Sequence, residues 1–253
     1  MKNHRFDFLE VLQYPDRASL GAEAGQRVAL AIRAAIAARG EARIIFACAP
    51  SQDEFLDALA SEPVDWSKVV VFHMDEYVSL LDTHPASFRS YLREHLLAQI
   101  RTPRTVNFLH AEAPAEHEIA RYTALLAERP IDISCVGIGE NGHLAFNDPP
   151  VANFRDPVSV KVVPLDDKCR DQQVHDRCFI SLEDVPTHAF TLTIPALMSA
   201  REISCVVPGP RKAVAVRDTL LGPVHTSCPA SILRTHPRAT MYIDDAAAAL
   251  LTP

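Results

Sequence analysis

Residues 131–150 read IDISCVGIGENGHLAFNDPP, and no other stretch says more about the architecture of this chain. The apolar run at 131–137 passes directly into glycines, which is typical of a buried parallel strand that ends in a tight turn. The two prolines at the end of the stretch leave no room for a regular helix after the glycines. His143 and Asp148 therefore share a constrained loop beyond a strand end. An imidazole beside a carboxylate is suited to proton transfer near neutral pH.

The same loop also contains a pattern that is associated with dinucleotide binding. Gly137, Gly139 and Gly142 form G-x-G-x-x-G. That fingerprint requires a helix that starts within the glycines and continues, so that its N-terminus faces the pyrophosphate. Pro149 and Pro150 stop any such helix within about one turn. Taken alone, the loop is then consistent either with catalysis or with a glycine turn that carries a solvated histidine and aspartate.

Helix-like and strand-like segments alternate on both sides of this loop. The expected helices are 19–39 with Gly40 as C-cap, 51–60, 87–100, 114–128, 211–221 and 245–251. The expected strands are 43–49, 69–73, 131–137, 158–163, 189–194, 202–207 and 240–243. This alternation predicts one α/β domain over residues 1–253, with a mostly parallel sheet covered by helices on both faces in a modified Rossmann-like arrangement.

Polar side chains follow four of the predicted strands at the points where they end. In chain order these are Ser51, Asp75, His143 and Lys212. The carboxyl ends of parallel strands lie along one edge of a sheet, where α/β proteins place their ligands. We therefore expect these four residues to converge on one pocket.

Composition narrows the possible partners. The chain has 253 residues, of which 48% are hydrophobic, and this is enough for a full core. Its net charge of -7 and the absence of a Lys/Arg-rich run argue against nucleic acid and anionic membranes as partners. There is no signal-peptide core and no apolar run of membrane-spanning length. Six cysteines without C-x-x-C or zinc-like spacing indicate reduced thiols, a cytoplasmic location and no bound metal.

Several motifs resemble one enzyme family. GIGENGHLAFNDPP is similar to the active-site loop of glucosamine-6-phosphate deaminases, G-x-G-x-[DN]-G-H-[IL]-[AG]-F-N-E-P. The related 6-phosphogluconolactonases share G-x-[DN]-G-H but continue towards A-S-L-F-P, so Phe146, Asn147 and Pro149 favour the deaminases. Further counterparts, in the family's order, are VVVFHMDEYVSL, SFRSYL, LDDKCR, DVPTHAFTLTIPALMSA and GPRKAVAV. Together they span about residues 42–244.

The resemblance implies an enzyme that needs no cofactor and converts glucosamine 6-phosphate, or an epimer, to a ketose phosphate and ammonia. Asp75 would be the base that moves a proton between neighbouring carbons. His143, held by Asp148, would open the sugar ring, and Asn141 would contribute by hydrogen bonding. The family usually has Glu where Asp148 stands. The shorter side chain requires a closer backbone, a bridging water or a weaker dyad.

The resemblance also implies a binding site for the substrate and its phosphate. Its residues would be Ser51, Glu76, Gly139, Gly142, Arg170 and Lys212. The family's phosphate loop, G-[GS]-[ST]-P, is altered here, because Ala49 and Pro50 precede Ser51 and proline donates no amide. Ser51 and Glu54 also fit the capping box S-x-x-E, so a cap and a phosphate ligand both remain open for Ser51. Glu76 could orient its loop instead of touching the substrate.

Two other functions stay open beside the deaminase. In a lactonase, His143 would activate water, but the AFNDP continuation argues against it. A sugar-phosphate-binding protein without turnover would explain the altered phosphate loop, but it has no need of a base such as Asp75. The expected partner is a small-molecule sugar phosphate, and the expected assembly is a monomer or a small homo-oligomer. Because the chain stops soon after Asp244, we expect no control through a longer C-terminal tail.

Overall fold

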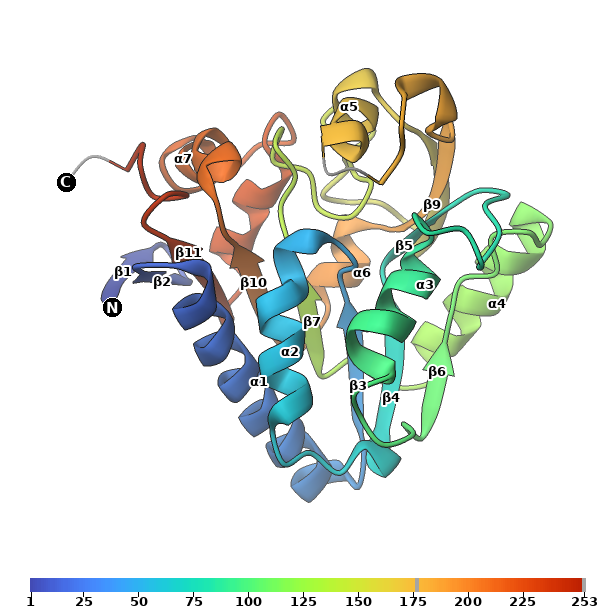
Figure 1. Ribbon diagram of the computed structural model, residues 1–253, viewed down its shortest axis with the longest axis horizontal. Coiled ribbons are helices and arrows are strands. Elements are labelled where there is room, and N and C mark those ends of the chain that lie inside the picture. Colours follow the sequence, from blue (N-terminus) through green and yellow to red (C-terminus); the bar gives the residue numbers. More distant parts are fainter. Residues whose placement is uncertain (176–177, 252–253) are drawn as a thin grey trace.

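The computed structural model describes residues 1–175 and 178–251 (Figure 1). Its main sheet has eight strands in the order β1-β2-β11-β10-β7-β3-β4-β6. These are β1 (Lys2–Phe6), β2 (Leu9–Tyr14), β3 (Ala42–Phe46), β4 (Val69–His73), β6 (Thr105–Asn107), β7 (Ile133–Val136), β10 (Glu202–Val207) and β11 (Ala239–Asp244). All neighbours run parallel except β1 and β2, which form an antiparallel hairpin at one edge. The predicted mostly parallel sheet is thus confirmed, and it has three strands that the sequence pattern did not reveal, the two of the hairpin and β6.

A second, smaller sheet was not expected. It is antiparallel and has the order β5 (Asp75–Tyr77), β9 (His188–Leu192) and β8 (Val160–Pro164). The strands predicted at 158–163 and 189–194 therefore exist, but their assignment to the parallel sheet was wrong. Their alternation marks them as strands without specifying a partner. In the structure β9 pairs with both β8 and β5. Strand β5 follows β4 after the single residue Met74, so Asp75 lies where the two sheets meet.

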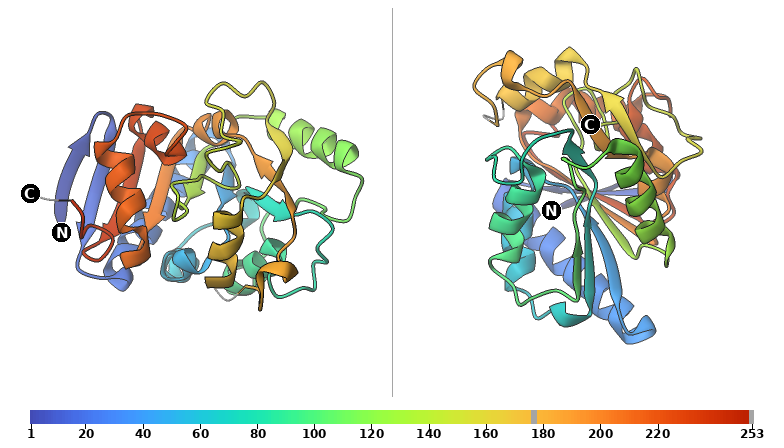
Figure 2. Two further views of the ribbon diagram at one scale, coloured as in Figure 1. Left: turned by 90° about the horizontal axis from the view of Figure 1, so that it is seen from above. Right: turned by 90° about the vertical axis from the view of Figure 1, so that its right-hand side faces the viewer.

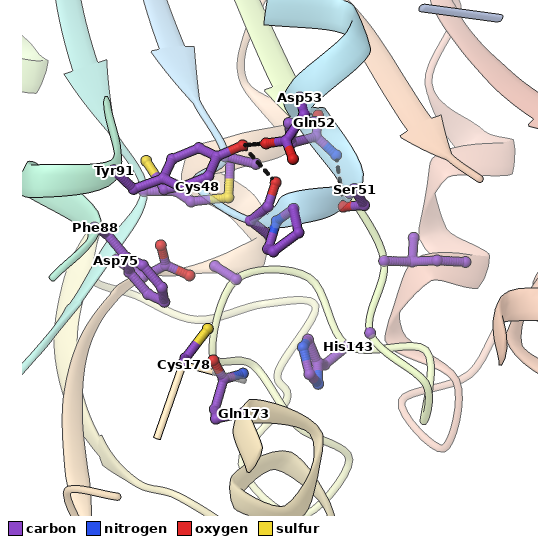
Figure 3. Close-up of a pocket in the computed structure, with 18 of the residues that line it drawn as sticks. Cys48, Ser51, Gln52, Asp53, Asp75, Phe88, Tyr91, His143, Gln173 and Cys178 are labelled. Atoms are coloured by element: carbon purple, nitrogen blue, oxygen red, sulfur yellow. Dashed lines mark hydrogen bonds between the residues drawn. The ribbon is translucent and has the colours of Figure 1, made fainter. Parts of the chain in front are cut away.

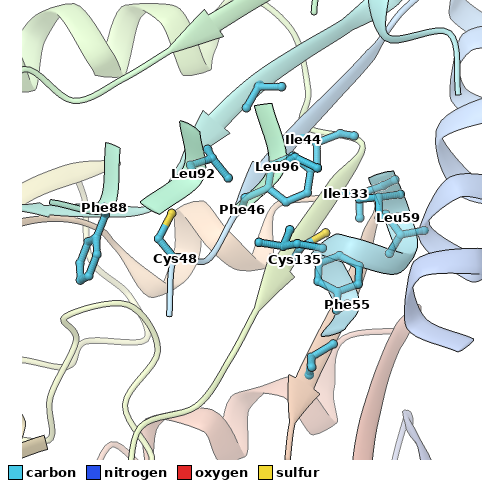
Figure 4. Packing of buried hydrophobic residues seen from close by; sticks show 14 of the residues in the cluster. Ile44, Phe46, Cys48, Phe55, Leu59, Phe88, Leu92, Leu96, Ile133 and Cys135 are labelled. Carbon is cyan, nitrogen blue, oxygen red and sulfur yellow. The ribbon is translucent and has the colours of Figure 1, made fainter. Parts of the chain in front are cut away.

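Helices cover both faces of the main sheet (Figures 1 and 2). One face carries α1 (Arg17–Arg39), α2 (Asp53–Ser61) and α3 (Phe88–Leu92), and the other carries α4 (Ala115–Ala127), α6 (Ile194–Met198) and α7 (Ala213–Leu221). Successive residues of β3 alternate between the faces, as a pleated strand requires. Ile44 and Phe46 pack in the first core and Ile45 in the second. Figure 4 shows the first core, where Phe55 and Leu59 of α2 pack near these β3 side chains.

Several expected helices have different bounds in the structure. The segment 51–60 begins as a 3₁₀ turn, η1 (Pro50–Gln52), before α2, and 87–100 is α3 followed by a π-helical turn, η3 (Arg93–Leu97). The segment 245–251 forms turns and no helix. A stretch this short is helical only when packing supports it, and of its side chains only Ala247 and Ala248 are buried.

His73 at the end of β4 is buried as a neutral imidazole. Burial, followed by the nearby charge of Arg89, lowers the pKa of His73 from 6.5 to about 3. Its Nε2 accepts a hydrogen bond from the backbone N–H of Leu109 at 2.8 Å. Since the pKa is lower in the folded state, the unfolded chain binds more protons between pH 6.5 and 3, and the free energy of unfolding falls as the pH falls through that window.

Replacing His73 with asparagine is expected to remove this part of the acid sensitivity. Between pH 7 and pH 5 the free energy of unfolding should fall by about 2 kcal/mol less in His73→Asn than in the wild type. Urea unfolding at both pH values measures this difference, and any constant loss from the bond to Leu109 cancels. His117→Asn, which removes an imidazole at an exposed position, is the matched control variant. Equal acid sensitivity in the wild type and His73→Asn would contradict the assignment.

Candidate functional site

The carboxyl ends of four parallel strands surround a cavity of about 310 Å³. One polar residue after each strand contributes to its lining: Ser51 after β3, Asp75 after β4, His143 after β7 and Lys212 after β10. Figure 3 shows Asp75 and His143 on different sides of this cavity, with Ser51 and Gln52 at a third position. The four side chains that the sequence places at strand ends therefore share one cavity.

Asp75 has the surroundings of a strong carboxylate base. Its side chain is buried and borders the cavity, and it has no hydrogen-bond partner among the residues that the structure describes. Burial raises the pKa of Asp75 well above its ordinary value, and the neighbouring charge of Glu76 raises it further. A carboxylate without donors has a high proton affinity, which suits it to removing a weakly acidic proton from carbon.

Glu76 belongs to a buried hydrogen-bond network and does not lie in the predicted substrate-binding position. It is fully buried, does not border the cavity, and accepts hydrogen bonds from backbone and side-chain donors. Its donors are the backbone N–H groups of Tyr77, Phe88 and Arg89, the Ser87 hydroxyl and the Arg89 guanidinium. Adjacent residues of β5 point to opposite faces, so Asp75 and Glu76 cannot both face the substrate. Glu76 fixes the start of α3 beside the cavity.

His143, Asp148 and Asn141 form a connected group on the loop after β7. His143 Nδ1 lies 2.7 Å from Asp148 Oδ1, although the ring N–H is not aligned for a linear hydrogen bond. Asn141 donates its amide to the same Oδ1 at 2.8 Å and accepts the backbone N–H of His143 at 3.0 Å. The contact is direct, so no water bridges the shorter aspartate to the ring. Asn141 contributes by hydrogen bonding from behind the pair.

Two glycines give this loop its shape. Gly142 has a φ of +82°, and a side chain there would also meet the Cys228 sulfur at 2.7 Å. It makes the turn and does not border the cavity. Gly139 does border the cavity, and a Cβ on it would lie 2.2 to 2.4 Å from three atoms of the His143 ring. The imidazole thus occupies the space that the missing side chain of Gly139 leaves open.

Ser51 lines the cavity and does not cap α2. The N-cap of that helix is Gln52, and Ser51 Oγ accepts a hydrogen bond from Gln52 Nε2 at 3.0 Å. The capping-box interpretation is therefore wrong, because η1 moves the helix start past Ser51. Glu54 instead pairs with Arg17 at 2.6 and 2.7 Å. The hydroxyl of Ser51 remains on the cavity side.

Asp53 stands at the same end of the cavity but is held by the protein. Its Oδ1 accepts the Tyr91 hydroxyl at 2.5 Å, and Tyr91 also lies 2.7 Å from the Ala49 carbonyl oxygen. Burial and the bond to Asp53 raise the pKa of Tyr91, so the phenol stays protonated. Figure 3 shows these contacts. The Asp53 carboxylate is therefore hydrogen-bonded to Tyr91 at this end of the cavity.

Of the two predicted basic ligands, the cavity contains one. Lys212 is buried at its edge, at the start of α7. Arg170 does not border the cavity. It belongs to α5 (Asp167–His175) and donates to the carbonyl oxygens of Leu182 at 2.5 Å and Val185 at 3.3 Å. These carbonyl acceptors hold the guanidinium outside the cavity. The position of Arg170 therefore does not support its predicted phosphate-binding role.

Other residues that line the cavity were not singled out from the sequence. They include Arg17, Cys48, Gln52, Phe88, Tyr91 and Gln173. Arg17 and Gln173 come from helices far apart in the chain, and no local sequence motif predicts that they line the cavity. For Gln52 one feature of the sequence indicated a position near the cavity, namely that it directly follows Ser51.

The site has the parts for proton transfer at two points of a bound molecule. A buried carboxylate and an imidazole–carboxylate pair face one cavity, with a lysine and a serine hydroxyl at its edge. Among residues 1–175 and 178–251, no group of three or more His, Cys, Asp or Glu side chains is arranged to hold a metal ion. Over the same residues, no helix has the length and apolar character needed to cross a membrane.

Comparison with known proteins gives one consistent family. The family model described as glucosamine-6-phosphate isomerases/6-phosphogluconolactonase matches residues 15–242. Glucosamine-6-phosphate deaminase from Listeria monocytogenes is 38% identical over 229 residues, which are 90% of this chain and 96% of the relative. The enzyme of that name from Lactobacillus delbrueckii subsp. bulgaricus is 31% identical over 96% of this chain and all of its own length.

Solved structures agree with this family. A monomeric glucosamine-6-phosphate deaminase superposes with a TM-score of 0.87 at 28% identity, over 95% of this chain and 99% of its own. The 6-phosphogluconolactonase from Thermotoga maritima superposes with a TM-score of 0.76 over 93% and 99% of the two chains. At 16% identity, the latter match shows a common fold alone.

Proposed function

Because the chain belongs to the glucosamine-6-phosphate isomerase/6-phosphogluconolactonase family, we propose that it is an amino-sugar-phosphate deaminase. The substrate is glucosamine 6-phosphate or an epimer, and the products are a ketose 6-phosphate and ammonia. The identity to enzymes named glucosamine-6-phosphate deaminase over most of their length supports this branch of the family. The reaction is a sequence of proton transfers and one hydrolysis, and it needs no cofactor.

The first step is opening of the sugar ring. His143 moves a proton from the anomeric hydroxyl to the ring oxygen, so that the ring C–O bond breaks and an aldehyde forms. A single imidazole performs both halves, because it accepts a proton and returns it at near-neutral pH. Asp148 at 2.7 Å stabilises the protonated ring between the two halves. Asn141 keeps the carboxylate in place.

The second step moves a hydrogen from C2 to C1. Asp75 removes the proton from C2, the carbon that bears the ammonium group, and the electron pair forms a C1=C2 double bond. The former aldehyde oxygen takes a proton from the ammonium group, which gives an enolamine. The protonated Asp75 then returns the proton to C1, which leaves an imine at C2. Addition of water to that imine releases ammonia and gives the ketose. The buried position of Asp75 carries this proposal, because it makes the carboxylate basic enough for a carbon acid.

The phosphate would lie at the end of the cavity where Ser51 and Lys212 are found. A buried ammonium group is a strong partner for a phosphate dianion. The Ser51 hydroxyl supplies a further donor. The proline at position 50 contributes none, so this end depends on side chains more than on backbone amides.

Ammonia release from purified protein tests the proposal. We expect turnover of glucosamine 6-phosphate, galactosamine 6-phosphate or both, and the ratio of the two kcat/KM values ranks the epimers. Parallel assays with 6-phosphogluconolactone test the other branch of the family. Hydrolysis of the lactone without ammonia release from either amino sugar would overturn the deaminase proposal and favour a lactonase. Binding of these sugars without any turnover would favour a non-catalytic protein.

A further inference from the structure

Gln52 makes a pair of hydrogen bonds that no motif predicted. Its side chain is 1% exposed and lies between η1 and the end of β10. Nε2 donates to Ser51 Oγ at 3.0 Å and to the carbonyl oxygen of Val206 at 3.2 Å. Figure 3 shows the bond between Gln52 and Ser51 at the edge of the cavity.

The contact with Val206 fixes the orientation of the Gln52 amide. A backbone carbonyl oxygen only accepts hydrogen bonds, so the nitrogen of the amide must face it. Both N–H groups are then used, one towards Val206 and one towards Ser51. Gln52 Oε1 is buried without a hydrogen-bond partner among the described residues, which is unfavourable for a polar atom. The structure thus tolerates an unpaired oxygen in order to keep two donors in place.

The orientation of the amide determines the direction of the Ser51 hydroxyl. Because Ser51 Oγ accepts from Gln52, its own proton must point away from that side chain. No hydrogen bond from this hydroxyl to another group that the structure describes is present, and Ser51 borders the cavity. We propose that Gln52 is a positioning residue, which directs the Ser51 proton towards the phosphate oxygens of the substrate. The identity of that ligand rests on the proposed function.

The rest of the loop makes this donor important. Pro50 lacks an N–H, and the backbone N–H of Gln52 is bonded to Ala49. In the loop pattern that Ser51 resembles, a proline follows the hydroxyl residue, whereas here Gln52 supplies two donors. Gly137 leaves room for it, since a Cβ at that position would lie 3.0 Å from Gln52 Nε2. Hydrogen bonds therefore hold the amide between the ends of β3 and β10, beside Gly137 after β7.

Two substitutions of similar shape test the proposal. Gln52→Met removes the hydrogen bonds, and Gln52→Glu reverses the direction of the bond to Ser51, because a carboxylate accepts the hydroxyl proton. Ser51→Ala in the wild-type and Gln52→Met backgrounds completes a double-mutant cycle. The readouts are KM and kcat for the amino-sugar phosphate and, independently of turnover, the dissociation constant for inorganic phosphate by calorimetry. Thermal unfolding shows that each variant is folded.

For Gln52→Met we expect KM and the phosphate dissociation constant to rise about tenfold, with kcat within about threefold of the wild type. Gln52→Glu should weaken both further. In the Ser51→Ala background Gln52→Met should cost little more, since there is no hydroxyl left to orient. Unchanged phosphate affinity in both folded Gln52 variants, additive losses in the cycle, or no phosphate binding by the wild type would each overturn the proposal. Weakened phosphate binding without ammonia release by the wild type would instead refute only the proposed function.

Discussion

Asp75→Asn is expected to lower kcat for ammonia release by at least about 1000-fold, while the substrate still binds. Asparagine has nearly the same shape as aspartate but cannot take a proton from carbon at neutral pH. KM should stay within a few-fold, because the phosphate end of the cavity is untouched. Steady-state kinetics, together with calorimetric binding of the sugar phosphate to the variant, separates these two quantities.

The pH dependence gives a second readout for Asp75. The base acts only when ionised, so kcat/KM of the wild type should fall as the pH drops through the raised pKa of this carboxyl. The acid limb should therefore lie above the ordinary pKa of an aspartate, and the residual activity of Asp75→Asn should lack it. An acid limb that persists unchanged in the variant would mean that another group is the base.

The neighbouring Glu76 is the matched control. Asp75→Asn should leave the free energy of unfolding at pH 7 unchanged or higher, because burial disfavours the charge that it removes. Glu76→Gln should lower that free energy by about 3 kcal/mol, because one acceptor oxygen is lost from a buried network with Arg89. Its kcat should fall less than about tenfold. If Glu76→Gln abolished turnover and Asp75→Asn did not, the roles assigned to these residues would be reversed.

The sequence predicted the site best where a residue follows a strand directly. Strand ends in a parallel sheet lie together whatever the loops do, so the convergence of Asp75, His143 and Lys212 follows from order along the chain. The Gly139–Gly142 turn is also local, since the glycines and the prolines after them exclude a helix. These parts of the fold and of the site required no knowledge of distant contacts.

The sequence predicted positions less well where a residue or strand has a tertiary partner that competes with the one its local pattern suggests. Arg170 carries the charge for a phosphate site, but the carbonyl groups of Leu182 and Val185 bind it, and only the tertiary structure brings them near. Strands β8 and β9 have the right periodicity, yet β9 pairs with β8 and β5, so neither strand belongs to the main sheet. Ser51 fits a capping box, but a 3₁₀ turn that starts at Pro50 shifts the helix by two residues. In each case the local pattern was compatible with two environments.

Gly139→Ala is expected to lower kcat by about 100-fold through its effect on His143. The added methyl group would lie 2.2 to 2.4 Å from the imidazole ring, so the ring must move by more than an ångström. A displacement of that size at a catalytic group costs about two orders of magnitude in rate. The backbone at Gly139 does not have a positive φ, so alanine itself adds no backbone strain. Steady-state kinetics on the folded variant measures the effect.

A double-mutant cycle shows whether the contact between the added methyl group and the His143 ring causes the loss of kcat. In a His143→Ala background there is no ring to displace, so Gly139→Ala should lower kcat by less than about threefold further. Gly137→Ala is the comparison within the same loop, because its methyl group would meet Gln52 and not His143. That variant should raise KM more than it lowers kcat, since the phosphate end is disturbed while the ring-opening pair is not. Full additivity of Gly139→Ala and His143→Ala would mean that Gly139 acts on the substrate or the backbone. The proposed steric effect of the added methyl group on the His143 ring would then be wrong.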